Sequence, residues 1–84
     1  MQQCWISVPM TDYFRENVLI KRPYIQPDWC LTALQTPAKR EVQLEDGRIR
    51  HWVYVEQLGK FLRVVTLEDG VTLHNAFPDR RFRL

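Results

Sequence analysis

The chain has 84 residues, of which 45% are hydrophobic and 26% charged, so one small domain fits and a large cofactor-binding fold does not. This apolar content argues against intrinsic disorder. Twelve Lys and Arg against ten Asp and Glu give a net charge of +2, which is too small to require a nucleic-acid partner by itself. Arg80, Arg81 and Arg83 crowd the C-terminus, and we expect residues 78–84 to form a solvated basic tail.

The first predicted helix lies within residues 11–21. Thr11 suits the N-cap position, and Phe14 and Val18 follow at the i,i+4 spacing of a helix face. The helix should end by Lys21, because Pro23 comes soon after it.

The second predicted helix begins at Pro27, since proline is favoured in the first helical turn. It should end before Pro37. Four residues form its apolar stripe, which we expect to enter the core: Trp29, Cys30, Ala33 and Leu34.

After residue 40 the apolar residues alternate with the period of a β-strand. The expected strands cover residues 41–44, 49–55, 61–67 and 71–77. Glu-Asp-Gly at 45–47 and again at 68–70 predicts two hairpin turns, and Leu58-Gly59 predicts a third. The run at 61–67 is apolar on both faces, which is typical of a central strand.

The sequence therefore predicts an α+β fold with two N-terminal helices packed on a four-stranded, mainly antiparallel sheet. We expect a single domain over residues 1–84, with an N-terminal segment (1–10), two helices (11–36), an antiparallel meander (41–77) and the basic tail (78–84).

The strand at 49–55 has two different faces. Its odd-numbered residues share one face, and Arg50, Trp52 and Tyr54 share the other. We expect Trp52 to pack beneath the helices, with an interface position or base stacking as alternatives.

Two cysteines, Cys4 and Cys30, are too few for a disulfide scaffold and too far apart for a zinc motif, and they leave their own pairing open. His51 and His74 fall on different strands. No apolar run approaches the roughly 20 residues of a membrane helix. We therefore expect a cytoplasmic protein with no metal, no other cofactor and no membrane partner.

Basic and imidazole side chains on strands suit chemistry that works by positioning. RNA cleavage by 2′-hydroxyl attack needs a base, an acid and a cation for the phosphorane charge, and it needs no metal. His74 is a candidate for the proton transfers. Arg63 is a candidate cation, although an ion pair with Glu68 or another acid is the plainer expectation.

Four stretches of the chain resemble the BrnT-like and DUF4258-like small proteins, which are related to the RelE-type toxin fold. They are residues 21–25 (Lys-Arg-Pro-Tyr-Ile), 34–37, 58–66 and 73–77, within a similarity that covers about residues 13–82. In that group a basic residue ends the first helix, a proline closes the second, and a Gly-led, Val-rich strand precedes the last strand and a C-terminal Arg.

The resemblance implies metal-independent mRNA cleavage under the control of a cognate antitoxin. The candidate catalytic residues are His74, Arg80, Arg81 and Arg63, and the candidate RNA-binding residues are Lys21, Arg22, Arg50, Tyr54 and Trp52. RNA, an antitoxin or other protein, and a second copy of the chain are the partners to consider. The alternatives are a noncatalytic nucleic-acid- or protein-binding module, or an accessory subunit with an apolar patch around Trp52 and Phe61.

Overall fold

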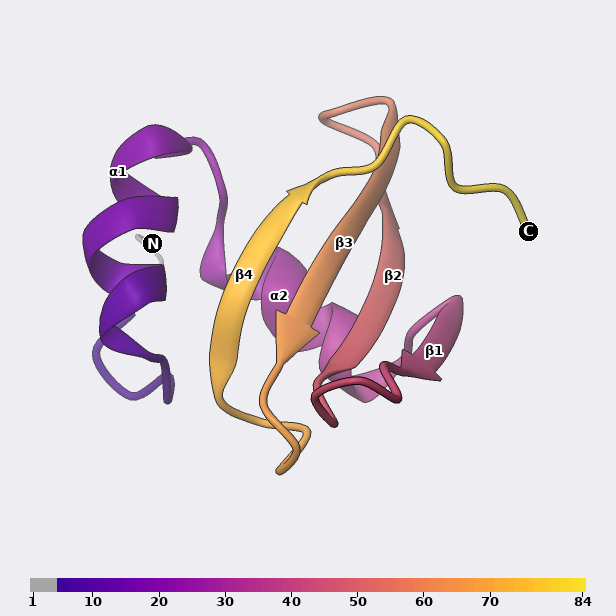
Figure 1. The fold of residues 1–84 in the computed structure, drawn as a ribbon. Coiled ribbons are helices and arrows are strands. Elements are labelled where there is room, and N and C mark those ends of the chain that lie inside the picture. Colours follow the sequence, from indigo (N-terminus) through magenta and orange to yellow (C-terminus); the bar gives the residue numbers. More distant parts are fainter. Residues whose placement is uncertain (1–4) are drawn as a thin grey trace.

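The computed structural model describes residues 5–84, and the expected α+β architecture is confirmed (Figure 1). The elements are η1 (Phe14–Val18), α1 (Leu19–Lys21), α2 (Pro27–Gln35), β1 (Lys39–Val42), β2 (Ile49–Val55), β3 (Lys60–Thr66) and β4 (Leu73–Pro78). Every helix among the described residues is too short to cross a membrane.

The first helix is continuous from η1 into α1. The Thr11 Oγ1 accepts a hydrogen bond from the Phe14 amide at 3.1 Å, so Thr11 caps the helix as predicted. The Leu19 amide donates to the Phe14 carbonyl, and this i→i+5 bond gives η1 its π-type turn. Phe14 and Val18 are both buried, because their spacing turns them to the same side.

The second helix starts at Pro27, as its sequence predicts, and ends at Gln35 before Pro37. Cys30 and Ala33 lie fully in the core, whereas Trp29 and Leu34 are partly buried and pack against it.

The sheet is an antiparallel meander in the order β1-β2-β3-β4. Gly47 and Gly70, which end the two Glu-Asp-Gly turns, have φ values of +77° and +73°, a conformation that glycine adopts without strain. Two predicted strand limits are wrong. Leu44 is 94% exposed in a turn, and β4 starts at Leu73 because the Asp69 carboxylate accepts hydrogen bonds from the backbone amides of residues 71 and 72.

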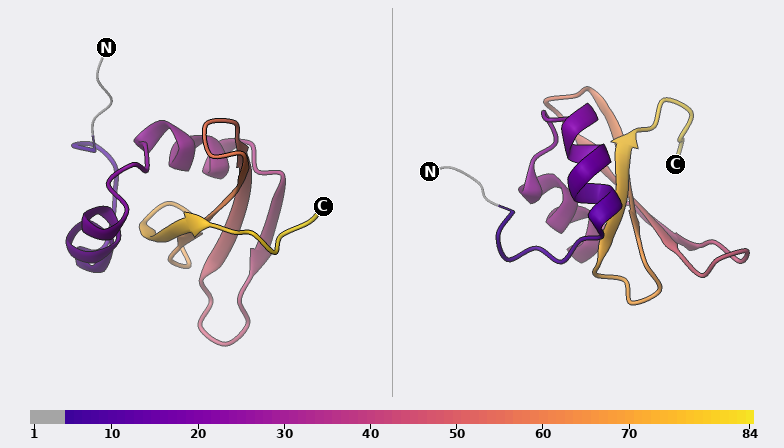
Figure 2. Two further views of the ribbon diagram at one scale, coloured as in Figure 1. Left: turned by 90° about the horizontal axis from the view of Figure 1, so that it is seen from above. Right: turned by 60° about the vertical axis from the view of Figure 1, so that its left-hand side comes forward.

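The helices pack on one face of the sheet, and the C-terminal segment lies on the other (Figures 1 and 2). The helix η1 packs against β4, and α2 packs against β2 and β3. The core between helices and sheet contains Phe14, Val18, Ile25, Cys30, Ala33, Val55, Leu62, Val64, Leu73 and Ala76. On the other face, the segment after β4 turns back across the sheet, which explains why the central strand β3 is apolar on both sides.

Candidate nucleic-acid interface

Three cations from separate parts of the chain meet at one end of the molecule. Arg22 directly follows α1, Lys60 begins β3, and Arg80 lies two residues beyond β4. The end of α1, the start of β3 and the end of β4 all lie at the top of Figure 1, because β3 and β4 are antiparallel. The fold therefore places together charges that are 58 positions apart at most in the sequence.

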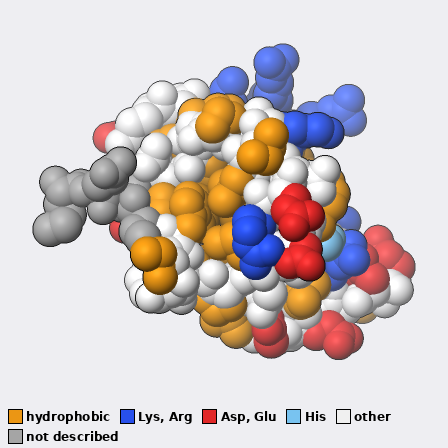
Figure 3. Space-filling view, turned by 90° about the vertical axis from the view of Figure 1, so that its left-hand side faces the viewer, with side chains coloured by type: hydrophobic (Ala, Val, Ile, Leu, Met, Phe, Trp, Pro, Cys, Tyr) orange, Lys and Arg blue, Asp and Glu red, His pale blue; other side chains and the backbone are white. Residues whose placement is uncertain are grey.

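These cations line a hollow of about 390 Å³, here called the basic cleft. Its lining is Arg22, Tyr24, Leu58, Lys60, Phe77, Pro78 and Arg80, so no Asp or Glu of the described chain contributes to it. In Figure 3, Lys and Arg side chains gather along the upper rim, whereas most of the visible Asp and Glu lie lower down. Positive and negative charges are thus distributed unevenly over the molecule. The net charge is only +2, but one end is basic and suits an anionic ligand.

An aromatic ring lies among the cations of the cleft. The Arg22 guanidinium lies 5.9 Å from the centre of the Phe77 ring, and the Arg63 guanidinium lies 5.0 Å from it. Cations at this distance are attracted to the face of the ring. Tyr24 is 43% exposed and adds a second ring to the lining. The surface combines positive charge with one exposed ring, Tyr24, on which a base can stack, whereas the half-buried Phe77 ring is in contact with the two guanidinium groups.

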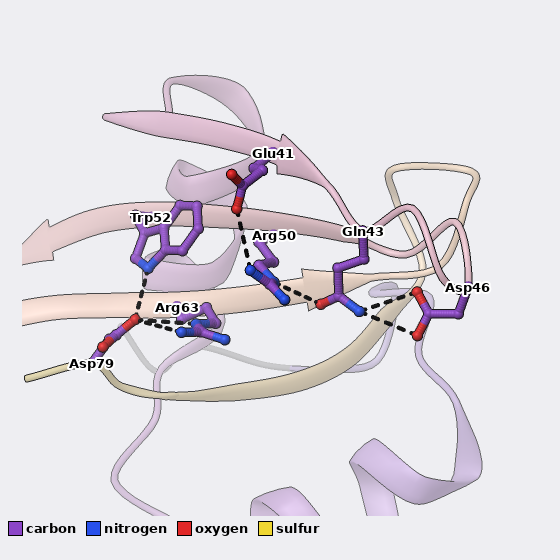
Figure 4. A network of polar contacts seen from close by, with 7 residues as sticks. All are labelled: Glu41, Gln43, Asp46, Arg50, Trp52, Arg63 and Asp79. Atoms are coloured by element: carbon purple, nitrogen blue, oxygen red, sulfur yellow. Dashed lines mark hydrogen bonds and ion pairs between the residues drawn. The ribbon is translucent and has the colours of Figure 1, made fainter. Parts of the chain in front are cut away.

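The residues after β4 are anchored by Asp79, which is 8% exposed (Figure 4). Its Oδ2 accepts hydrogen bonds from the Trp52 Nε1 at 2.9 Å and from the Arg63 Nε and Nη2 at 3.1 and 2.9 Å, and its Oδ1 accepts from the Arg81 amide. Burial raises the pKa of Asp79, but these hydrogen bonds and the Arg63 charge outweigh it and hold the pKa below its ordinary value. The Arg63 partner is thus Asp79, an acid other than Glu68.

Trp52 lies on the face of the sheet opposite the helices, so the expectation that it packs beneath them is wrong. It is 4% exposed, because the Phe82 ring stacks on it with centroids 4.5 Å apart and planes within 12°. Phe82 also meets the edge of Phe61 at 4.9 Å. The C-terminal segment therefore packs on the sheet through Phe82, and the expectation of a fully solvated tail is wrong. Its exposed residues are Arg80, Arg81, Arg83 and Leu84.

A second hollow, of about 400 Å³, adjoins the basic cleft and shares Lys60 and Arg80 with it. It also contains Tyr54, which is 52% exposed and meets Phe61 edge-on at 5.3 Å. Arg83 adds a third cation to the lining of this C-terminal hollow, and Asp79, whose carboxylate is paired with Arg63, is its one acidic lining residue in the described chain.

His74 lies at the opposite end of β4 from Arg80. The strand residues from His74 to Pro78 alone span about 13 Å, and Arg80 lies beyond them, so these two candidates do not converge on one reacting group. The His74 Nδ1 lies 3.1 Å from the Thr11 Oγ1, and its ring packs at 5.1 Å from Tyr13. Burial and the nearby charge of Arg48 lower the pKa of His74.

The other predicted site residues fall in different places. Arg50 belongs to a polar network lower on the sheet, where it donates to Glu41 at 3.2 Å and to Gln43 at 2.9 Å (Figure 4). Lys21 is exposed at the end of α1, next to Arg22 in the chain, and it does not line the basic cleft. Arg81 is exposed, but its side chain lines neither of the two hollows.

The described part of the chain contains neither a cluster of metal-binding side chains nor an exposed cysteine. No group of three or more His, Cys, Asp and Glu side chains among residues 5–84 is placed to hold a metal ion. Cys30 is a free, buried cysteine, and burial raises the pKa of its thiol to about 12, so it is not a nucleophile at neutral pH. Cys4 lies outside the described residues.

Sequence reasoning missed Lys60, Phe77, Asp79 and Phe82. Lys60 directly precedes one predicted strand and Phe77 ends another, and only the register between β3 and β4 brings them to the same end of the sheet. The fold and its surface define a small α+β protein with a basic, aromatic cleft at one end of the sheet. The chain matches no family model, and neither a curated protein nor a solved structure shows significant similarity to it.

Proposed function

We propose that this protein binds RNA through the basic cleft. The observation that carries the proposal is the convergence of Arg22, Lys60 and Arg80 around Phe77 with no carboxylate in the lining. Phosphate neutralisation by Lys and Arg supplies the sequence-independent part of nucleic-acid binding. The exposed Tyr24 ring favours an unpaired base, which is the usual target of RNA-binding proteins.

The test is fluorescence anisotropy with a labelled single-stranded RNA of about 12 nucleotides. The Arg22→Ala/Arg80→Ala variant removes two phosphate contacts. We expect its affinity at low salt to fall by about tenfold or more, and the slope of log K against log salt to flatten by about 1.4.

The matched control is Arg15→Ala/Arg48→Ala, which makes the same change of net charge away from the cleft. Both of these arginines form exposed ion pairs, with Asp12 and Asp46. The proposal predicts a nearly unchanged slope for the control. Equal loss in the two double variants would overturn it, because the binding would then depend on net charge alone.

A second candidate function is metal-independent RNA cleavage, with an antitoxin as its regulator. It is favoured by Tyr54, Lys60 and Arg80 around the C-terminal hollow, since these residue types can supply an acid, a base and a cation for the phosphorane. Its test is incubation of a mixed RNA pool with the protein in excess chelator. Fragments ending in a 2′,3′-cyclic phosphate that disappear with Lys60→Ala would support it, and intact RNA bound by the protein would leave the binding function alone.

A further inference from the structure

The aromatic cluster beside the basic cleft is built in two parts with different anchoring. The Trp52 ring is fixed in its plane, because its indole N–H donates to the Asp79 carboxylate, which Arg63 also holds. The Asp79 amide in turn donates to the Phe61 carbonyl at 2.8 Å. This part of the cluster is a preorganised flat surface on a rigid strand.

The second part is Phe82, and it is held differently. Among the described residues, the backbone hydrogen bonds of the C-terminal segment end at the Arg81 amide, and Phe82 is attached through its ring contacts with Trp52 and Phe61. Rotation of the chain after Arg81 would therefore lift Phe82 from Trp52 without breaking the Asp79 anchor.

The geometry of Phe82 is the geometry of a stacked base. Its ring is parallel to the indole to within 12°, at a centroid distance of 4.5 Å. A nucleobase in its place would recover a similar stacking surface, so the exchange of one ring for the other costs little. The adjacent hollow supplies cations for the attached phosphates, namely Lys60, Arg80 and Arg83. Asp79 also lines this hollow, but its carboxylate is already paired with Arg63.

We propose that Trp52 is a stacking site for an unpaired nucleobase, and that Phe82 occupies this site in the free protein and is displaced by the base. The inference rests on the proposed function and deepens it, because it makes single-stranded RNA the ligand class. A base paired in a duplex is stacked on both sides and cannot reach the Trp52 ring. Phe82 is therefore an intramolecular competitor that the RNA must replace.

Two substitutions at one position test the competition, with the same labelled RNA. Removal of the competing ring in Phe82→Ala should tighten binding by about fivefold. The larger ring in Phe82→Trp should stack more strongly on Trp52 and weaken RNA binding. A folding defect would weaken binding in both variants, so opposite effects exclude misfolding and support competition.

The position of the base is read by ¹⁹F spectra of protein labelled with 5-fluorotryptophan, with resonances assigned by Trp→Phe variants. We expect single-stranded RNA to shift the Trp52 resonance more than those of Trp5 and Trp29, and a duplex of the same length to leave it in place. If RNA binds in an Arg22- and Arg80-dependent way but Trp52 does not respond and Phe82→Ala binds no tighter, the stacking site is wrong and the proposed function stands. If neither the wild type nor Phe82→Ala binds RNA, both are wrong.

Discussion

Replacement of Asp79 by alanine should lower the free energy of unfolding by about 3 kcal/mol, which is a large part of the stability of a small domain. The variant leaves the Trp52 indole N–H and the Arg63 guanidinium without their acceptor, and the Arg63 side chain is only 27% exposed. A buried donor or charge that loses its partner costs much more than the net strength of the bond. Urea unfolding followed by tryptophan fluorescence measures the change.

Two further variants separate the loss of the acceptor from the loss of a charge. Asp79→Asn keeps an acceptor oxygen and should lose clearly less stability than Asp79→Ala. Asp12→Ala removes an ion-paired carboxylate that is 82% exposed, and it should cost about 0.5 kcal/mol or less. If Asp79→Ala proved as mild as Asp12→Ala, Asp79 would not anchor the C-terminal segment.

The second large effect is a loss of stability in mild acid caused by His51. This side chain is 1% exposed, its Nε2 lies 3.0 Å from the Thr66 Oγ1, and its Nδ1 has no hydrogen-bond partner. Burial, with a smaller contribution from Arg40, lowers the pKa of His51 from 6.5 to about 4. The folded state therefore favours the neutral ring, whereas the unfolded state takes up a proton as the pH falls below 6.5.

The contribution of His51 to the free energy of unfolding should not change with pH above about 6.5. Between pH 6.5 and pH 4 the free energy of unfolding should fall by about 3 kcal/mol. The lowered pKa values of Asp69 and Asp79 act in a different window, because a carboxylate with a lowered pKa loses its contribution only as the pH falls below its ordinary value of 3.8. Urea unfolding at a series of pH values measures the slope.

His51→Leu should remove most of the dependence of the free energy of unfolding on pH between 6.5 and 4. This holds whether the variant is more or less stable than the wild type at neutral pH. His74→Gln is the matched control, because His74 is less buried and its Nδ1 has a partner in Thr11. The control should keep most of the slope. An unchanged slope in His51→Leu would show that the buried imidazole is not the group that titrates.

Much of the fold could be predicted because local signals and the tertiary structure agree. Thr11 caps the first helix, Pro27 starts the second, and the Glu-Asp-Gly turns set the hairpins. The errors occur where the apolar alternation continues past the end of strand pairing: Leu44 lies in a turn, and Val71 lies in the connection between β3 and β4.

The site was less predictable, because it depends on contacts between distant residues. The alternation placed Trp52 on the correct strand face, but nothing in the local sequence says that Phe82 covers it. Three arginines near the C-terminus suggested a solvated tail, whereas Asp79 turns the segment back onto the sheet. The basic cleft needs the register of β3 and β4 to bring Lys60 beside Arg80.

The most direct test of RNA binding at the basic cleft is a titration of ¹⁵N-labelled protein with single-stranded RNA, followed by amide chemical shifts. We expect the largest changes at Arg22, Lys60, Phe77 and Arg80 and at the adjoining Trp52 and Phe82, with little change in the acidic turns at 45–47 and 68–70. Changes spread evenly over the surface, changes centred on the acidic turns, or no change at all would contradict it.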